Sequence, residues 1–193
     1  MVNILLIDNF DSFTYNLVQL LEETMLCNLT VIRYDKVTEA DIEAADGFVI
    51  SPGPGTPADF PMLEKWVAKY YKSKSILGVC MGYEAIGLAF GAKLYNLGTV
   101  FHGITKTSYI IKPNHYFVKD IPSPFQAGLY HSWTLADKDF PQELSILSKS
   151  DDNVIMMVAH QNHNVVGVQF HPESIMTPDG GQMVKNWLER ISI

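Results

Sequence analysis

Residues 76–86 read Ile76-Leu77-Gly78-Val79-Cys80-Met81-Gly82-Tyr83-Glu84-Ala85-Ile86. This stretch carries one cysteine, flanked by glycines, from an apolar strand into a helix, which is the pattern of a nucleophile elbow. So tight a turn forces the cysteine into an unfavourable backbone conformation and leaves room only for small neighbours such as Gly78 and Gly82. The helix N-terminus beside Cys80 lowers a thiol pKa and stabilises an oxyanion. The stretch therefore predicts a reactive thiol, although a single cysteine taken alone is more often a buried structural residue.

The chain before the elbow alternates short apolar runs with amphipathic stretches. The apolar runs are 4–7, 30–34 and 48–50, and the amphipathic stretches are 14–25, 38–45 and 62–71. Such βαβα order favours a parallel sheet covered by helices on both faces, with ligands received at the carboxyl ends of the strands. Asp11 and Ser12 are the expected caps of the first helix.

The chain after Gly91 changes to strand-like pieces separated by proline and asparagine turns. These pieces are 93–97, 105–111, 130–135, 144–148 and 154–159, followed by an apolar strand at 165–170 and an amphipathic helix at about 180–191. The expected fold class is therefore α/β, with a mostly parallel central sheet, helices on both faces and a small mixed or antiparallel extension.

Composition limits the kinds of protein that this chain can be. With 193 residues, 47% of them hydrophobic, and no linker-like segment, we expect a single domain over residues 1–193. The formal net charge of −7 argues against a nucleic-acid partner. No stretch approaches the roughly 20 apolar residues that span a bilayer, so we expect no membrane partner. Two cysteines without a secretory leader indicate a reducing compartment, and we expect a cytoplasmic protein.

A histidine and a glutamate can complete the chemistry of Cys80. His171 lies just beyond a buried strand, as Cys80 does, so both side chains can emerge at one sheet edge. A Cys–His pair can attack an acyl carbon and then protonate the departing amine. Glu173, linked through Pro172, can turn its carboxylate back to orient the imidazole. We call Cys80, His171 and Glu173 the triad; the alternative is a strand-end histidine beside a solvated glutamate.

An acyl thioester also needs backbone amides aimed at the developing oxyanion. Gly53 and Gly55 in the loop 51–57 offer such amides without side-chain obstruction, and the loop follows the third apolar run. The amide of Met81, directly after the cysteine, is the usual second donor at an elbow. Read alone, the loop is equally an ordinary proline-glycine turn.

Together these segments resemble the class I, triad-type glutamine amidotransferases along essentially the whole chain. Within that class the chain looks like the glutaminase subunit of anthranilate synthase or of aminodeoxychorismate synthase. The segments that carry the resemblance are Asp8-Asn9-Phe10-Asp11-Ser12-Phe13-Thr14-Tyr15-Asn16-Leu17, Ser51-Pro52-Gly53-Pro54-Gly55, Tyr130-His131-Ser132 and Phe170-His171-Pro172-Glu173-Ser174.

The resemblance implies a reaction and two partners. The subunit would hydrolyse L-glutamine through a thioester on Cys80 and pass ammonia to a separate chorismate-binding synthase subunit. No cofactor is expected. Anthranilate and aminodeoxychorismate remain alternative products, because the partner performs the chorismate chemistry. A non-catalytic regulatory subunit and a partner-free thiol hydrolase of the same architecture are further alternatives.

The resemblance also assigns roles to residues that would hold the substrate. Gly53 and Gly55 match the loop that frames the substrate and the oxyanion, and Ser132 and the following Trp133 match the part that meets glutamine through backbone groups. For Trp133, where relatives commonly have leucine, an aromatic residue in the core is the alternative reading.

Glu84 is the main departure from the family pattern. The elbow of the family usually ends in glutamine, whose amide helps to hold the α-amino and α-carboxylate groups of the substrate. An ionised Glu84 could accept from the ammonium but could not donate to the carboxylate, and it would raise the cost of the thiolate. Three outcomes follow: weakened glutamine binding, a protonated Glu84 that mimics the amide, or a subunit that no longer hydrolyses glutamine.

The remaining histidines and the second cysteine suggest no further chemistry. The histidines do not cluster at metal-ligand spacing, so no metal site is expected; they are His102, His115, His131, His160 and His163. His160 and His163 are expected to be solvated at a strand end and its turn. Cys27 is expected in the core or at its boundary.

Overall fold

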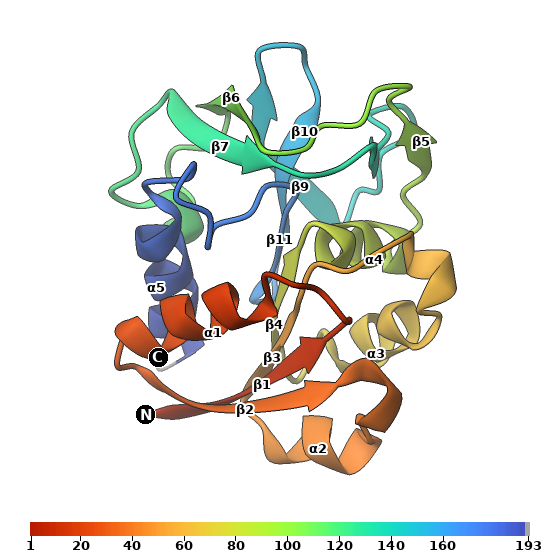
Figure 1. Cartoon of the computed structure of the whole chain (residues 1–193), viewed down its shortest axis with the longest axis vertical. Coiled ribbons are helices and arrows are strands. Elements are labelled where there is room, and N and C mark those ends of the chain that lie inside the picture. The colour runs from red at the N-terminus through yellow and green to blue at the C-terminus, as the bar shows by residue number, and fades with distance from the viewer. Residues whose placement is uncertain (192–193) are drawn as a thin grey trace.

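The computed structural model describes residues 1–191, and within them nine strands form one mixed sheet (Figure 1). The strands lie in the order β2 (Cys27–Arg33), β1 (Val2–Asp8), β3 (Gly47–Ile50), β4 (Ser75–Val79), β11 (Val165–Val168), β10 (Ile155–His160), β9 (Leu144–Ser150), β6 (Ile104–Ile110) and β7 (Phe125–Leu129). From β2 to β11 neighbouring strands run parallel. From β11 to β7 every neighbouring pair is antiparallel.

Helices cover both faces of the parallel half (Figure 1). On one face lie α1 (Thr14–Glu23) and α5 (Gly180–Ile191), and on the other lie α2 (Glu39–Ala44), α3 (Met62–Tyr70) and α4 (Met81–Ala89). Side chains of β1 alternate between these two cores: Ile4 packs with α1 and α5, whereas Leu5 packs with the other helices. Strands buried on both faces read as continuous apolar runs. Among the described residues, no helix is long and apolar enough to cross a membrane.

This architecture confirms the predicted fold class, and its antiparallel half differs from the prediction in detail. The predicted strand at 130–135 is wrong in extent, because only β8 (Trp133–Leu135) is a strand, and it pairs with β5 (Leu94–Asn96) in a separate two-stranded sheet. The sheet edge is formed instead by β7, which the sequence pattern did not predict. Short 3-10 helices lie at Tyr34–Lys36, Pro57–Asp59 and Tyr116–Val118.

The start of α1 also differs from the prediction. The helix begins at Thr14 after Phe13, and neither Asp11 nor Ser12 occupies the cap position; the cap residue makes no side-chain cap hydrogen bond. The Asp11 carboxylate instead accepts the backbone N–H of Phe13 at 2.7 Å. Asp11 therefore orders the turn before the helix rather than the first turn of the helix itself.

His160 is buried, which makes the prediction of a solvated side chain wrong. Its ring packs 5.2 Å from Tyr71 and 5.1 Å from Phe90, measured between ring centroids. Its Nδ1 accepts the backbone N–H groups of Asn162 and His163, so the ring closes the turn after β10. Cys27 is half-buried at the edge of the core, as predicted.

Candidate active site

Cys80 lies in the sharp turn between β4 and α4. Its backbone has φ 52° and ψ −102°, a strained conformation for any residue with a side chain. The turn is tight enough to exclude side chains on both sides of the cysteine. A Cβ on Gly78 would lie 2.3 Å from the carbonyl oxygen of Gly82, and a Cβ on Gly82 would lie 2.5 Å from that of Ile50. Packing against backbone thus explains both glycines of the elbow.

The sheet brings His171 to the same edge as Cys80. Strands β4 and β11 are parallel neighbours with Val79 opposite Val168 at their carboxyl ends. Cys80 directly follows the end of β4, and His171 lies shortly beyond the end of β11. The backbone N–H of Cys80 donates to the carbonyl of Val168 at 2.8 Å, which joins the two strand ends. The backbone N–H of His171 donates to the carbonyl of Gly128 at 3.0 Å. The ring of His171 packs edge-on against Phe13 and Tyr130, which limits its orientation.

His171 and Glu173 form a buried pair. Nδ1 of His171 lies 2.6 Å from Oε1 of Glu173, and both side chains are almost fully buried. Because a carboxylate accepts, Nδ1 carries the proton of this hydrogen bond, which leaves Nε2 for proton exchange. Nε2 is buried and has no hydrogen-bond partner within normal limits.

The electrostatics of the triad favour proton exchange between Cys80 and His171. Burial lowers the pKa of His171, but its interactions with Cys80 and Glu173 outweigh burial and raise that pKa above its usual value. Burial raises the pKa of the Cys80 thiol, and His171 opposes this rise. Attraction of the imidazolium to the thiolate and to Glu173 favours the charged pair, while burial and the repulsion between the thiolate and Glu173 disfavour it.

A cavity of about 220 Å³ opens beside the cysteine. The residues proposed from the sequence to bind the substrate all line it together with Cys80: Gly53, Gly55, Met81, Glu84, Ser132 and Trp133. Trp133 is half-buried, and it contributes to the cavity wall rather than to the core alone. Of the two remaining triad members, His171 meets this wall through Tyr130, whose ring centroid lies 4.9 Å from its own.

Hydrogen bonds between two loops hold the glycine loop beside the elbow. The backbone N–H of Asn9 donates to Oγ of Ser51 at 2.9 Å, and Nδ2 of Asn9 donates to the Ser51 carbonyl at 2.8 Å. A Cβ on Gly53 would lie 2.4 Å from Cε of Met81 and 2.8 Å from Cβ of Asn9. Gly53 therefore fits only as glycine, in direct contact with the residue that follows the nucleophile.

Glu84 lies in the first turn of α4 with 3% of its surface exposed. Burial raises its pKa to about 8, against a smaller lowering by a hydrogen bond with Gln169. None of the ion pairs found among residues 1–191 involves Glu84. Nε2 of the fully buried Gln169 also lies 3.9 Å from Sγ of Cys80.

Sequence reasoning missed several residues of this site, above all His131 and Gln169. His131 lines the cavity, and its Nδ1 lies 2.9 Å from the carbonyl of Trp133, so Nδ1 is the donor and the buried Nε2 an unpartnered acceptor. Burial lowers the pKa of His131 to about 4. The signal for Gln169 was a polar residue within an otherwise apolar run. Within residues 1–191, no three metal-ligating side chains gather.

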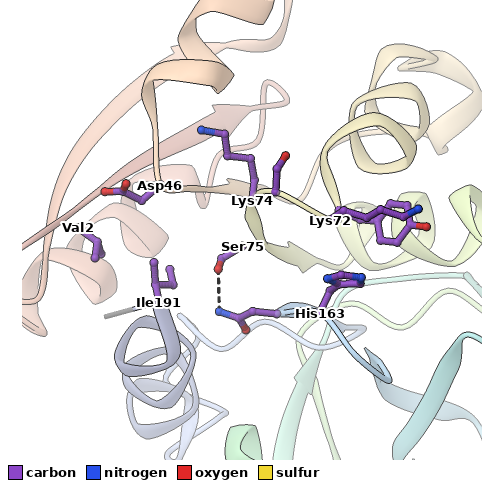
Figure 2. Close-up of a pocket in the computed structure, with 10 residues that line it drawn as sticks. Val2, Asp46, Lys72, Lys74, Ser75, His163 and Ile191 are labelled. Carbon is purple, nitrogen blue, oxygen red and sulfur yellow. Dashed lines mark hydrogen bonds between the residues drawn. The ribbon is translucent and has the colours of Figure 1, made fainter. Parts of the chain in front are cut away.

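A larger cavity, of about 380 Å³, lies at the opposite edge of the sheet (Figure 2). It is lined by residues at the amino ends of the parallel strands, among them Val2, Asp46 and Ser75. Several of its polar groups already have protein partners: Asn164 donates to Oγ of Ser75 at 2.9 Å, the dashed line in Figure 2. Lys74 donates to two backbone carbonyls at the end of α2. This cavity carries no comparable chemistry.

A strained cysteine at a strand–helix elbow lines a cavity, and a buried His–Glu pair lies at the same sheet edge; this arrangement is typical of a thiol-dependent acyl-transfer site. The family model for class-I glutamine amidotransferases matches residues 5–191 of the chain. The chain belongs to this family and is a glutamine amidotransferase.

Two relatives and one solved structure show which members of the family the chain is similar to. The chain is 38% identical over 189 residues to anthranilate synthase component 2 of Pyropia yezoensis, covering 96% of this chain and 98% of the relative. It is 36% identical over 198 residues to anthranilate synthase component 2 of Methanothermobacter thermautotrophicus, covering 97% and 99%. A glutamine amidotransferase structure from Thermotoga maritima, 15% identical, has a TM-score of 0.79 and covers 98% of this chain and 97% of that one, which supports the fold.

Proposed function

We propose that this chain is a glutaminase subunit that hydrolyses L-glutamine through a thioester on Cys80 and passes ammonia to a chorismate-binding synthase subunit. The observation that carries the proposal is the buried His171–Glu173 hydrogen bond of 2.6 Å beside a strained cysteine that lines a cavity. Residues 1–193 form one amidotransferase domain in this proposal. Its catalytic residues are the triad.

The first half of the reaction forms the thioester. His171 accepts the thiol proton at Nε2, and Sγ of Cys80 attacks the carboxamide carbon of glutamine. Glu173 holds the imidazole by its Nδ1–H and stabilises the imidazolium that forms. When the tetrahedral intermediate collapses, the imidazolium gives its proton to the departing nitrogen, and the C–N bond breaks to release ammonia.

The second half hydrolyses the thioester. His171 accepts a proton from water, the resulting hydroxide attacks the thioester carbon, and the C–S bond breaks to give glutamate. The proton returns from His171 to the thiolate of Cys80. The sum of the two halves is glutamine plus water giving glutamate plus ammonia, and the triad ends in its starting state.

The oxyanion of both tetrahedral intermediates needs donors already in place. The amides of Gly53 and Met81 are the proposed donors, because the two residues are packed together at the cavity wall. Gly55, with φ 80°, shapes the rest of the loop. Glu84, Ser132 and Trp133 are the proposed contacts for the amino-acid end of glutamine.

The partner follows from the relatives that carry the name anthranilate synthase component 2 over nearly the same length. Anthranilate is therefore the product that we propose for the complex. Ammonia released into water at neutral pH is protonated and diluted, so the acceptor subunit must dock over the cavity. The cytoplasm is the proposed location, since both cysteines are free thiols.

The test uses the complex of this chain with its synthase subunit. Chorismate amination is measured with glutamine and, separately, with ammonium salts as nitrogen source. We expect both to support amination, and we expect the chain to be needed only for the glutamine-dependent rate. Amination by ammonia but never by glutamine would overturn the proposal and leave a non-catalytic subunit as the explanation.

A further inference from the structure

Glu84 is a buried acid whose negative charge would have little compensation from its surroundings. Its side chain lines the cavity beside Cys80 and is almost fully buried. An ionised carboxylate taken out of water costs several kcal/mol unless a cation or several donors meet it. Among residues 1–191 Glu84 belongs to no ion pair, and its side chain shares a hydrogen bond with Gln169.

The groups that face Glu84 favour its neutral form. On its own segment lie the Cys80 thiol and the Tyr83 hydroxyl, and a charged Glu84 raises the pKa of both. Across the cavity lies His131, which burial keeps neutral. Two cations near the cavity are already paired: the imidazolium of His171 with Glu173, and Lys106, which acts on His131, with Asp152. Burial accordingly raises the pKa of Glu84 to about 8.

The side chain of Gln169 lies within hydrogen-bond reach of Glu84. Its amide lies between Glu84 and the thiol, with Nε2 3.9 Å from Sγ, while its buried Oε1 has no hydrogen-bond partner. The hydrogen bond with Glu84 lowers the pKa of the acid, so the Gln169 amide donates it. The O–H of a protonated Glu84 is then left free to donate to a substrate.

We propose that Glu84 binds glutamine as a neutral carboxylic acid whose O–H donates to the α-carboxylate of the substrate, and that glutamine binding is lost when Glu84 ionises. This inference rests on the proposed function. The neutral acid has nearly the same shape as a glutamine side chain and, like it, offers both a donor and an acceptor. Only the acid loses its donor at alkaline pH.

Ionisation would harm the site in two ways. A carboxylate at position 84 repels the α-carboxylate of glutamine and can no longer donate to it. It also adds a second negative charge to a cavity in which the thiolate of Cys80 and then an oxyanion must form. Glutamine recognition in this chain is therefore linked to one proton.

The experiment compares the wild type with Glu84→Gln in the assembled complex between pH 6.5 and 9.5. In the wild type, KM for glutamine should be constant at the acid end and rise about tenfold per pH unit above the pKa of Glu84. In E84Q this rise should be absent. The substrate ammonium titrates in both proteins, so the difference between the two profiles reports the charge of Glu84, including its effect on the pKa of Cys80.

The ammonia-dependent amination rate of the same complex serves as the internal control, since it does not use the cavity. Equal KM profiles for the wild type and E84Q would overturn the inference while leaving the glutaminase intact. Absence of glutamine-dependent activity in the wild type at every pH would instead overturn the proposed function. The two failures are thus distinguishable.

Two further measurements test the proposal: the first needs no turnover, and the second needs no Glu84 variant. The infrared spectrum of the resting protein at pH 6.5 should contain a protonated carboxylic acid band that E84Q lacks. Replacement of Gln169 by leucine should move the alkaline rise of KM to higher pH, because the hydrogen bond with Gln169 lowers the pKa of Glu84. A missing band, or an unmoved midpoint in a folded Q169L, would contradict the proposal.

Discussion

The two edges of the parallel sheet both carry cavities, and they differ in how their polar groups are satisfied. The cavity at the amino edge has about 380 Å³ and the one at the carboxyl edge about 220 Å³. Of the seven buried polar side-chain atoms without a partner among residues 1–191, five belong to residues in or beside the smaller cavity. These are Asn9, His131, Gln169, His171 and Glu173. Unpaired buried polar groups cost free energy, so their concentration marks the reactive edge better than size does.

The largest effect on activity is expected from removing the nucleophile at the carboxyl edge. Cys80→Ser should reduce glutamine-dependent amination by at least about a thousandfold, because the hydroxyl is a far weaker nucleophile than a thiolate. Ammonia-dependent amination by the same complex should stay at the wild-type rate. Steady-state assays with the two nitrogen sources measure both. Retention of glutamine-dependent activity would show that the reaction uses another site.

The orienting carboxylate comes next in expected effect. Glu173→Gln should reduce glutamine hydrolysis by about a hundredfold, because a neutral amide stabilises the imidazolium poorly and permits the wrong tautomer. The carboxylate raises the pKa of His171, so the pKa should be lower in the variant. NMR titration of the imidazole measures that shift. A variant with unchanged activity and an unchanged His171 pKa would reduce Glu173 to a packing residue.

The synthase subunit should bind at the carboxyl edge of the sheet and not at the amino edge. Ile175, two residues after Glu173, is 95% exposed, and Met25 at the turn before β2 is 80% exposed. Ile175→Asp should weaken binding of the synthase subunit about tenfold, roughly 1.4 kcal/mol. Met25→Asp, at the amino edge, is the matched control and should bind normally. Calorimetric titration of the two subunits would show the contrast, and equal affinities would place the partner elsewhere.

The smallest effect on activity is expected at the amino edge. Asn164 donates to Oγ of Ser75 at 2.9 Å and to the carbonyl of Trp187, and it accepts from the hydroxyl of Tyr116. Asn164→Ala should lower the free energy of unfolding by about 2 kcal/mol, since buried partners are left unpaired. KM and kcat for glutamine should not change. Urea denaturation and steady-state assays test both parts, and a raised KM would link the two edges.

The sequence predicted the parallel half of the fold well, because its strands are buried on both faces and its helices are amphipathic. It missed β7, a short segment in which Gln126 and Gly128 interrupt the apolar residues. Gly128 is required by packing: a Cβ there would lie 2.8 Å from Cβ of Met176. Contacts between segments distant in sequence thus decide the antiparallel edge, and a local pattern does not contain them.

The candidate site was predictable to a similar extent. The elbow glycines identified the cysteine, and the order of strands indicated that His171 would lie near it. The burial of His160 was not predictable, because it depends on Tyr71 and Phe90 from other elements. That Glu84 belongs to no ion pair within residues 1–191 is likewise a property of the fold, since a sequence does not show which lysines reach which carboxylates.

The backbone of Cys80 has one more consequence. With φ 52° the residue occupies a conformation that glycine adopts with little strain and that cysteine adopts only under constraint from its surroundings. The side chain best suited to folding at this position is thus not the one best suited to chemistry. Selection for stability alone would favour glycine at position 80. The resulting subunit would keep its fold but lose its activity.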